Sequence, residues 1–198
     1  MRKGKAFIIS GPSGVGKSTA LAELLKMRKD IYFSVSATTR APRPGEVDGV
    51  HYHFLDGDTF RDWIGQDEFL EHAEFVGNYY GTPKKYVYEA MESGKDVILD
   101  IEVQGAMLVK AKMPEVVRIF VAPPSWSELE RRLTDRGTDS ADKIQKRLQR
   151  AKDDFDTAKI YDYFVINDTV ESVVAELNAI MTAEHCKPEE RIAMINES

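Results

Sequence analysis

A glycine-rich loop between an apolar segment and a helix-forming segment constrains this chain more than any other feature. Residues 11–18 read Gly-Pro-Ser-Gly-Val-Gly-Lys-Ser and match the pattern G-x-x-x-x-G-K-[ST] without a mismatch. The apolar run at 6–10 is too short for a helix and predicts a strand, whereas 20–26 predicts a helix with leucines on one face. Strand, glycine loop and helix in this order are typical of a loop that binds the phosphates of a nucleoside triphosphate.

The residue types of this loop suit a chain of phosphates. Glycines leave room for the anion and let successive backbone N–H groups point at it, and the positive end of the following helix adds to the attraction. A lysine and a hydroxyl at the end of the pattern reach the β- and γ-phosphates and Mg²⁺, respectively. The residues predicted to bind the nucleoside triphosphate are therefore Gly11, Pro12, Ser13, Gly14, Val15, Gly16, Lys17, Ser18 and Thr19.

Composition narrows the class of protein. With 198 residues, of which 42% are hydrophobic, the chain is expected to form one domain, with or without inserted subdomains. A net charge of −6 and a pI near 5.3 argue against a nucleic-acid partner. No apolar stretch is long enough to span a membrane, the first strand leaves no room for a signal peptide, and Cys186 is the single cysteine. We therefore expect a cytoplasmic protein without an internal disulfide.

Residues 31–81 predict a strand, a loop and a small inserted sheet. A strand at 31–37 leads into a loop with Arg40 and Arg43, which are either solvated or, at the end of a core strand, anion-binding. Strands are predicted at 50–54 and 69–76, with a turn at 77–78, and a short helix at 59–64 behind an Asp58 cap. His51 and His53 share one strand face, but no third metal ligand follows at a useful spacing.

The second half of the chain predicts a return to the α/β core. Helices are expected at about 83–93, 107–111 and 170–184, and strands at 96–100, 116–122 and 163–166. The strand at 96–100 ends in Asp100, at the edge where open α/β sheets bind ligands, so a Mg²⁺ role is preferred over a purely structural one. Ser125 with Glu128 predicts a capping box.

A charged, arginine-rich region at 126–157 is either a solvated surface or a closing lid. A break at 137–140 separates two predicted helices in it. The arginines that stand out are Arg132, Arg136 and Arg147. Arginines on two helices hinged at a glycine, in a chain with a phosphate-binding loop, favour the lid.

The motifs together resemble the guanylate kinase family, from Lys5 to about Ala183. They are Ile-Ser-Gly-Pro-Ser-Gly at 9–14, Ser-Val-Ser-Ala-Thr-Thr-Arg-Ala-Pro-Arg at 34–43, Gly-Glu-Val-Asp-Gly at 45–49, Gly-Asn-Tyr-Tyr-Gly-Thr at 77–82, Leu-Asp-Ile-Glu-Val-Gln-Gly at 99–105 and Arg-Leu-x-x-Arg-Gly-Thr at 132–138. Each motif is moderately specific, and their order and spacing are very specific.

The resemblance implies an α/β nucleoside-monophosphate kinase fold in a single domain over 1–198. Its parts would be a parallel-sheet core at 1–35, 89–125 and 158–198, a mixed α/β GMP-binding insert at 36–88 and a helical lid at 126–157. It further implies ATP and GMP as substrates, Mg²⁺ as cofactor and a cytoplasmic monomer or homo-oligomer. GMP would be bound by Ser36, Arg40, Arg43, Tyr52, Glu71, Tyr80, Thr82, Asp100 and Glu102.

The implied guanine site agrees with the chemistry of the base. Guanine presents adjacent N1–H and N2–H₂ donors that one carboxylate, Glu71, can accept together, whereas adenine has no hydrogen on N1. Ser36 or Thr82 would donate to O6. The family often has Asp where this chain has the longer Glu102, and Ser where it has Thr82, which keeps the hydroxyl. Adenine of ATP would lie near Asn167 and Asp168.

The implied reaction is ATP + GMP → ADP + GDP, with dGMP as a further acceptor. A GMP phosphate oxygen is already anionic, so the reaction needs positioning and charge neutralisation but no general base. The catalytic residues would be Lys17, Arg40, Arg132, Arg136 and Arg147, and Ser18 and Asp100 would hold Mg²⁺. Two alternatives remain: an inactive protein-interaction domain of the same fold, and a kinase for another phosphorylated acceptor.

Overall fold

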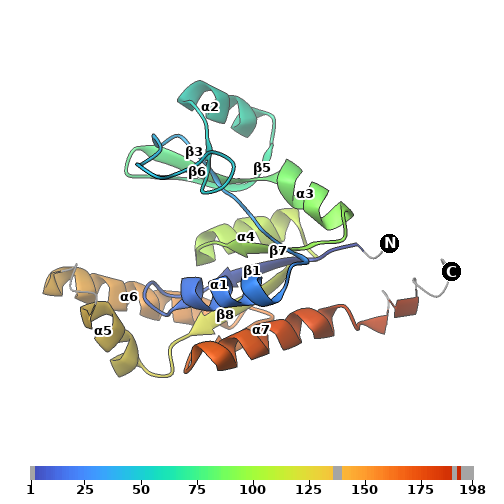
Figure 1. The fold of residues 1–198 in the computed structure, drawn as a ribbon. Coiled ribbons are helices and arrows are strands. Elements are labelled where there is room, and N and C mark those ends of the chain that lie inside the picture. The colour runs from blue at the N-terminus through green and yellow to red at the C-terminus, as the bar shows by residue number, and fades with distance from the viewer. Residues whose placement is uncertain (1–2, 136–139, 189–190, 193–198) are drawn as a thin grey trace. The chain divides into compact units, whose positions relative to one another are not determined.

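The computed structural model describes residues 3–135, 140–188 and 191–192 (Figure 1). The chain divides into two compact units. The first unit comprises Lys3–Ile8 and Asp30–Val117, and the second comprises Ile9–Lys29 and the described residues from Arg118 onward. The division into core, insert and lid expected from the sequence stays a prediction. In the described part of the chain, no helix has the length and apolar character that crossing a membrane requires.

The fold is α/β, as the sequence predicts, with a sheet of parallel strands. Its five strands run in the order β2-β7-β1-β8-β9, and both β2 with β7 and β8 with β9 pair in parallel. The central strands are buried over most of their length because both faces of such a sheet are covered. The strand bounds are β1 Ala6–Ser10, β2 Ile31–Phe33, β7 Asp96–Asp100, β8 Val117–Ala122 and β9 Tyr163–Ile166.

A second, mixed sheet lies within the first unit, as the alternating segments of the sequence predict. Its order is β4-β3-β6-β5, with one parallel pair, β3 with β4, and antiparallel pairs elsewhere. Phe60 of helix α2 stacks on Phe69 of β5 at 4.4 Å between ring centroids, and both pack with Ala37. The elements are β3 Ala37–Thr38, β4 His53–Phe54, α2 Gly57–Gly65, β5 Phe69–Phe75 and β6 Asn78–Pro83.

Three expectations for this unit were wrong in detail. Residues 31–37 form two strands, not one, because β2 pairs in the large sheet and β3 in the small one. The strand expected at 50–54 is reduced to His53–Phe54. The cap of α2 is Asp56, not Asp58: Asp56 has extended backbone angles, and its side chain accepts from the Thr59 N–H at 2.8 Å. Asp58 lies in the first turn instead.

Helices α3 (Lys84–Glu92) and α4 (Val103–Lys112) complete the first unit. Helix α3 packs against β7, and α4 packs against β5. Helix α4 begins four residues before the segment for which the sequence predicts a helix, so residues 103–106 are helical as well. That additional turn follows directly on Glu102, which is the N-cap residue of α4.

The second unit contains the glycine loop and the helices α1 Lys17–Met27, α5 Trp126–Asp135, α6 Ala141–Ala158 and α7 Val170–Glu184. Helices α1 and α7 lie side by side (Figure 1). Leu129 and Leu133 of α5 pack against Ala151 of α6. Half of the predicted capping box forms: Ser125 Oγ accepts from the Glu128 N–H at 3.1 Å, whereas the Glu128 carboxylate binds arginines of α5.

Candidate nucleotide-binding sites

The predicted phosphate loop joins β1 to α1 in the second unit. Gly16 is the N-cap of α1, the helix has no side-chain cap, and its first turn contains no acidic residue. The cap and the first turn of α1 therefore place no negative charge at the positive end of the helix, which suits an anion. The Lys17 ammonium donates a hydrogen bond of 2.8 Å to the Gly11 carbonyl, so it folds back over the loop. Ser18 and Thr19 are exposed at the start of α1.

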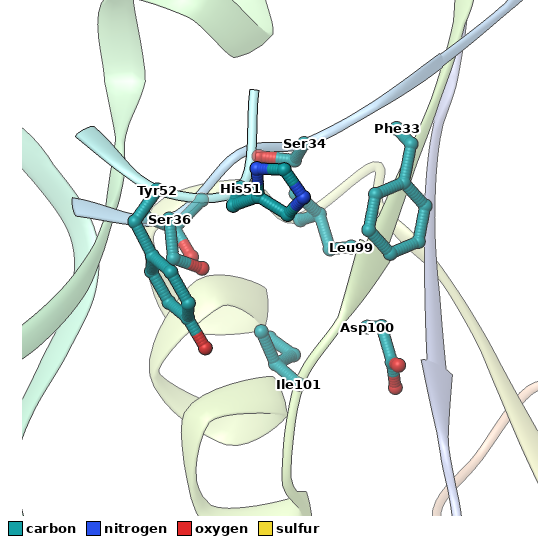
Figure 2. Close-up of a pocket in the computed structure, with 9 residues that line it drawn as sticks. Phe33, Ser34, Ser36, His51, Tyr52, Leu99, Asp100 and Ile101 are labelled. Atoms are coloured by element: carbon teal, nitrogen blue, oxygen red, sulfur yellow. The ribbon is translucent and has the colours of Figure 1, made fainter. Parts of the chain in front are cut away.

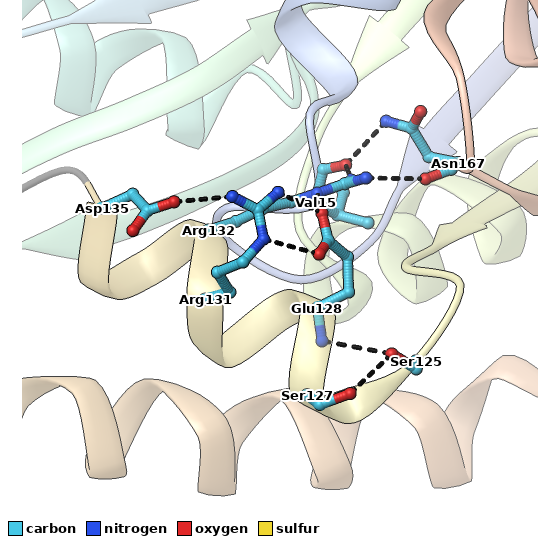
Figure 3. A network of polar contacts seen from close by, with 8 residues as sticks. All are labelled: Val15, Ser125, Ser127, Glu128, Arg131, Arg132, Asp135 and Asn167. Atoms are coloured by element: carbon cyan, nitrogen blue, oxygen red, sulfur yellow. Dashed lines mark hydrogen bonds and ion pairs between the residues drawn. The ribbon is translucent and has the colours of Figure 1, made fainter.

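Arg132 attaches α5 to the loop (Figure 3). Its guanidinium donates from Nη1 to the Val15 carbonyl at 3.0 Å and from Nη2 to the Asn167 carbonyl at 3.2 Å. The Asn167 amide nitrogen donates to the same Val15 carbonyl at 2.6 Å. Two predicted ATP-side residues, Arg132 and Asn167, are thus brought to the loop backbone from positions far along the chain.

Glu128 holds the Arg132 side chain in this position. Its Oε1 accepts from Arg132 Nε at 2.7 Å, and both of its carboxylate oxygens accept from Arg131. These hydrogen bonds, from Arg131 first and Arg132 second, lower the pKa of Glu128 to about 2. Glu128 is therefore ionised at neutral pH and orients the guanidinium. The half-buried Arg147 lies on α6, and the predicted Arg136 lies outside the described residues.

A pocket of about 170 Å³ lies in the first unit (Figure 2). Tyr52 and Ser36 lie on one side of it, and Phe33 and Asp100 lie on the other. The pocket collects four residues predicted to bind GMP, which are Ser36, Tyr52, Thr82 and Asp100. Its remaining lining residues, which the sequence reasoning did not assign to this site, are Phe33, Ser34, His51, Leu99 and Ile101.

Glu71 forms a hydrogen bond with Thr82, which lines the pocket. The Thr82 hydroxyl on β6 donates to Glu71 Oε1 on β5 at 2.6 Å. Burial raises the pKa of Glu71, hydrogen bonds from Thr82 oppose this rise, and the charge of Glu102 adds to it. The result is a partly buried carboxylate with one oxygen bound to a hydroxyl, which suits a ligand with adjacent N–H donors.

Arg40 is held by a residue whose role the sequence reasoning missed. Both terminal nitrogens of the Arg40 guanidinium donate to Glu46, each at 2.8 Å. Glu46 also accepts from the Arg43 backbone N–H at 2.6 Å, and the Arg40 guanidinium lies 5.2 Å from the centre of the Tyr52 ring. The Tyr52 ring in turn contacts that of Tyr80, at 6.2 Å between centroids. Glu46 lies in the motif at 45–49, so the sequence contained a signal that could have identified this residue.

Within the described part of the chain, His51 and His53 form no metal site. His51 Nδ1 accepts from the Val47 N–H at 3.0 Å, and the His53 ring stacks on Tyr86 at 4.3 Å. No group of three or more histidine, cysteine, aspartate or glutamate side chains able to hold a metal occurs among the described residues. A Mg²⁺ that is bound mainly by phosphates needs only one or two protein oxygens and does not require such a group.

Comparison with known proteins places the chain in a family. Residues 3–184 match the model of the guanylate kinase family. A guanylate kinase of Halalkalibacterium halodurans is 53% identical over 190 residues, which cover 96% of this chain and 93% of the relative. One of Thermus thermophilus is 53% identical over 182 residues, with 92% and 82% covered.

A solved structure supports membership of the same family. The crystal structure of guanylate kinase from Anaplasma phagocytophilum has a TM-score of 0.73 at 34% identity and covers 95% of this chain and 89% of that one. The family model, which matches residues 3–184, includes the glycine loop, the residues that line the pocket of the first unit, and helices α5 and α6. This chain belongs to the guanylate kinase family.

Proposed function

We propose that this protein transfers the γ-phosphoryl group of ATP to GMP and releases ADP and GDP. The family membership supports the reaction. The observation that carries the choice of acceptor is the Glu71 carboxylate, which the Thr82 hydroxyl holds at 2.6 Å. Guanine N1–H and N2–H₂ can both donate to that carboxylate, whereas adenine would place a lone pair against it. Sites built on such polar pairing reject the wrong base strongly.

Charge neutralisation is the second part of the proposed mechanism. The Lys17 ammonium leaves the Gly11 carbonyl for the β- and γ-phosphates, and Arg132, Arg136 and Arg147 stabilise the migrating phosphoryl group. Arg40, Arg43, Tyr52 and Tyr80 bind the phosphate of GMP, whose oxygen is already anionic. Preorganised cations act without reorganisation at the moment of reaction.

Mg²⁺ fits the residues that the chain offers. The exposed Ser18 hydroxyl and the exposed Asp100 carboxylate are hard oxygen donors of the kind this ion prefers. They belong to different units, so the assignment of both to one ion is inferred from the sequence pattern alone. When bound, the ion neutralises charge on the ATP phosphates. We also expect dGMP to serve as an acceptor and the protein to be cytoplasmic.

The experiment that tests the function is an assay of ADP release with ATP, Mg²⁺ and each of GMP, AMP, CMP and UMP. Turnover confined to GMP and lost in Glu71→Ala supports the proposal. ATP binding without turnover of any of the four contradicts it and favours another phosphoryl acceptor. Absence of ATP binding favours the inactive interaction domain.

Substitutions of the residues that are proposed to neutralise phosphate charge test the mechanism. Lys17→Ala or Arg147→Ala is expected to lower kcat at least about a hundredfold, because each removes a preorganised charge. Lys26→Ala on the same helix as Lys17 is the matched control, since the Lys26 ammonium forms an exposed ion pair with Glu23 and has no predicted role at the loop. Full activity of Lys17→Ala would refute the assignment.

A further inference from the structure

Gly105, in the first turn of α4, directly faces the Glu71 side chain. A Cβ atom added at Gly105 would lie 3.3 Å from Glu71 Oε2 and 3.5 Å from both Cδ and Cγ. The added atom would therefore crowd Oε2, which would have to move by a few tenths of an ångström, and would be in van der Waals contact with Cδ and Cγ. At Gly65, the last residue of α2, a Cβ would meet nothing within 4 Å.

Glu71 has little room to withdraw from such an atom. Its other carboxylate oxygen, Oε1, accepts the 2.6 Å hydrogen bond of Thr82. Its backbone carbonyl lies 3.0 Å from the place that a Cβ at Gly81 would take, so the opposite strand also approaches closely. A movement of the carboxylate would lengthen the Thr82 hydrogen bond or shift the β5–β6 pair.

The backbone does not require a glycine at position 105. The residue lies inside a regular helix and does not have the positive φ that favours glycine elsewhere in the chain. Alanine has the higher helix propensity at such a position. The absence of a side chain at position 105 is therefore explained by the nearby Glu71 side chain and not by the backbone of the helix.

We infer that Gly105 is a specificity-determining residue of the guanine site, which sets the position of the Glu71 carboxylate. This inference rests on the proposed function. Reading guanine N1–H and N2–H₂ together requires both carboxylate oxygens in the plane of the base. Gly105 provides the space in which Glu71 takes that position while its other side is bound to Thr82.

The test compares Gly105→Ala with Gly65→Ala in the full chain. Gly105→Ala is expected to raise the KM for GMP about tenfold. A misplacement of 1 Å costs about a hundredfold, and the Glu71 carboxylate would move by only a few tenths of an ångström, so the loss should be smaller. The KM for ATP and the kcat at saturating GMP stay within about twofold of wild type. The Tm does not fall, since alanine favours the helix. Gly65→Ala leaves both KM values unchanged.

A double-mutant cycle with Glu71→Asp separates positioning from a general packing effect. The shorter aspartate withdraws from position 105, so Gly105→Ala should add little to the KM in the Glu71→Asp background. An unchanged KM in Gly105→Ala, equal effects of Gly105→Ala in both backgrounds, or a fall in Tm that accompanies the KM change would overturn the inference. Lack of GMP turnover by the wild-type protein would instead refute the proposed function.

Discussion

The hydroxyl of Thr82 donates a 2.6 Å hydrogen bond to Glu71 Oε1 across the antiparallel pair of β5 and β6. Thr82 is almost fully buried, so the bond is protected from water. In the proposed guanine site, Thr82 would act through Glu71 as well as by lining the pocket.

Replacement of this hydroxyl by a methyl group should weaken GMP binding. Thr82→Val keeps the shape of the side chain but removes the donor, and we expect the KM for GMP to rise about tenfold, the cost of one hydrogen bond to a charged group. Thr82→Ser keeps the hydroxyl and should stay within about threefold of wild type. Steady-state kinetics with varied GMP measures both, and equal KM values for the two variants would contradict the positioning role.

Glu71 should make the free protein less stable at neutral pH. Burial raises its pKa in the folded state above the unfolded value. Its contribution to stability is therefore fully present below the unfolded pKa and is lost as the pH rises through the folded pKa. Glu71→Gln should consequently have a higher Tm than wild type at pH 7 without nucleotide and no advantage at pH 4, while losing GMP turnover.

Thermal melts from pH 4 to 8 measure this difference. Glu74→Gln, on the exposed part of the same strand, is the control and should not show the pH-dependent gain. In the wild-type protein, the KM for GMP should rise on acidification, because a protonated carboxyl accepts fewer hydrogen bonds. A Tm advantage of Glu71→Gln that grows at low pH would contradict a raised pKa for Glu71.

Glu46 should determine how well Arg40 meets the phosphate of GMP. The two hydrogen bonds of 2.8 Å fix the plane of the guanidinium, and Glu46→Gln loses the charge that holds it. We expect the KM for GMP to rise about tenfold, with an unchanged KM for ATP. Glu23→Gln, which breaks an exposed ion pair on α1, provides the comparison.

The ion pair between Glu46 and Arg40 should also affect how the stability of the protein changes at acidic pH. Hydrogen bonds from Arg40, and then from the Arg43 backbone, lower the pKa of Glu46 from 4.5 to about 2. The stability that it contributes is present above the unfolded pKa and is lost as the pH falls from about 4.5 towards 2. Denaturant titrations should show a smaller loss over that range in Glu46→Gln, and an equal loss would exclude this source of acid sensitivity.

Gly16 should be less tolerant of a side chain than Gly45, although both have a positive φ, +96° and +88°. Alanine at either position costs about 1–2 kcal/mol of backbone strain. At Gly16 the new Cβ would also lie 2.6 Å from the Asn167 amide nitrogen, whereas at Gly45 nothing lies within 4 Å. Gly16→Ala should therefore lose about 1 kcal/mol more stability than Gly45→Ala.

Urea denaturation of the two variants measures the difference. Gly16→Ala should also bind ATP more weakly, because the displaced Asn167 amide no longer supports the Val15 carbonyl of the loop. Equal losses of stability would show that strain alone determines the cost at both positions.

Features that depend on near neighbours in the chain could be predicted from the sequence. The pattern of residues 11–18 predicts the loop before α1, and the strands at 6–10, 96–100 and 163–166 have the expected bounds. Periodicity and glycine positions decide these features within a few residues. The same information failed where two local solutions compete, as for Asp56 and Asp58 at the start of α2.

The sequence alone predicted the phosphate-loop pattern and the α/β class, and the family resemblance implied which residues would form a guanine site. Which residues meet depends on the tertiary structure: Thr82 contacts Glu71, Gly105 lies against Glu71, and Arg132 contacts the Val15 carbonyl 117 positions away. Such contacts depend on strand register and on the packing of helices, which no short segment encodes alone. For that reason the residue types of the expected sites could be predicted from the chain, while the contacts of Glu71, Arg40 and Arg132 could not.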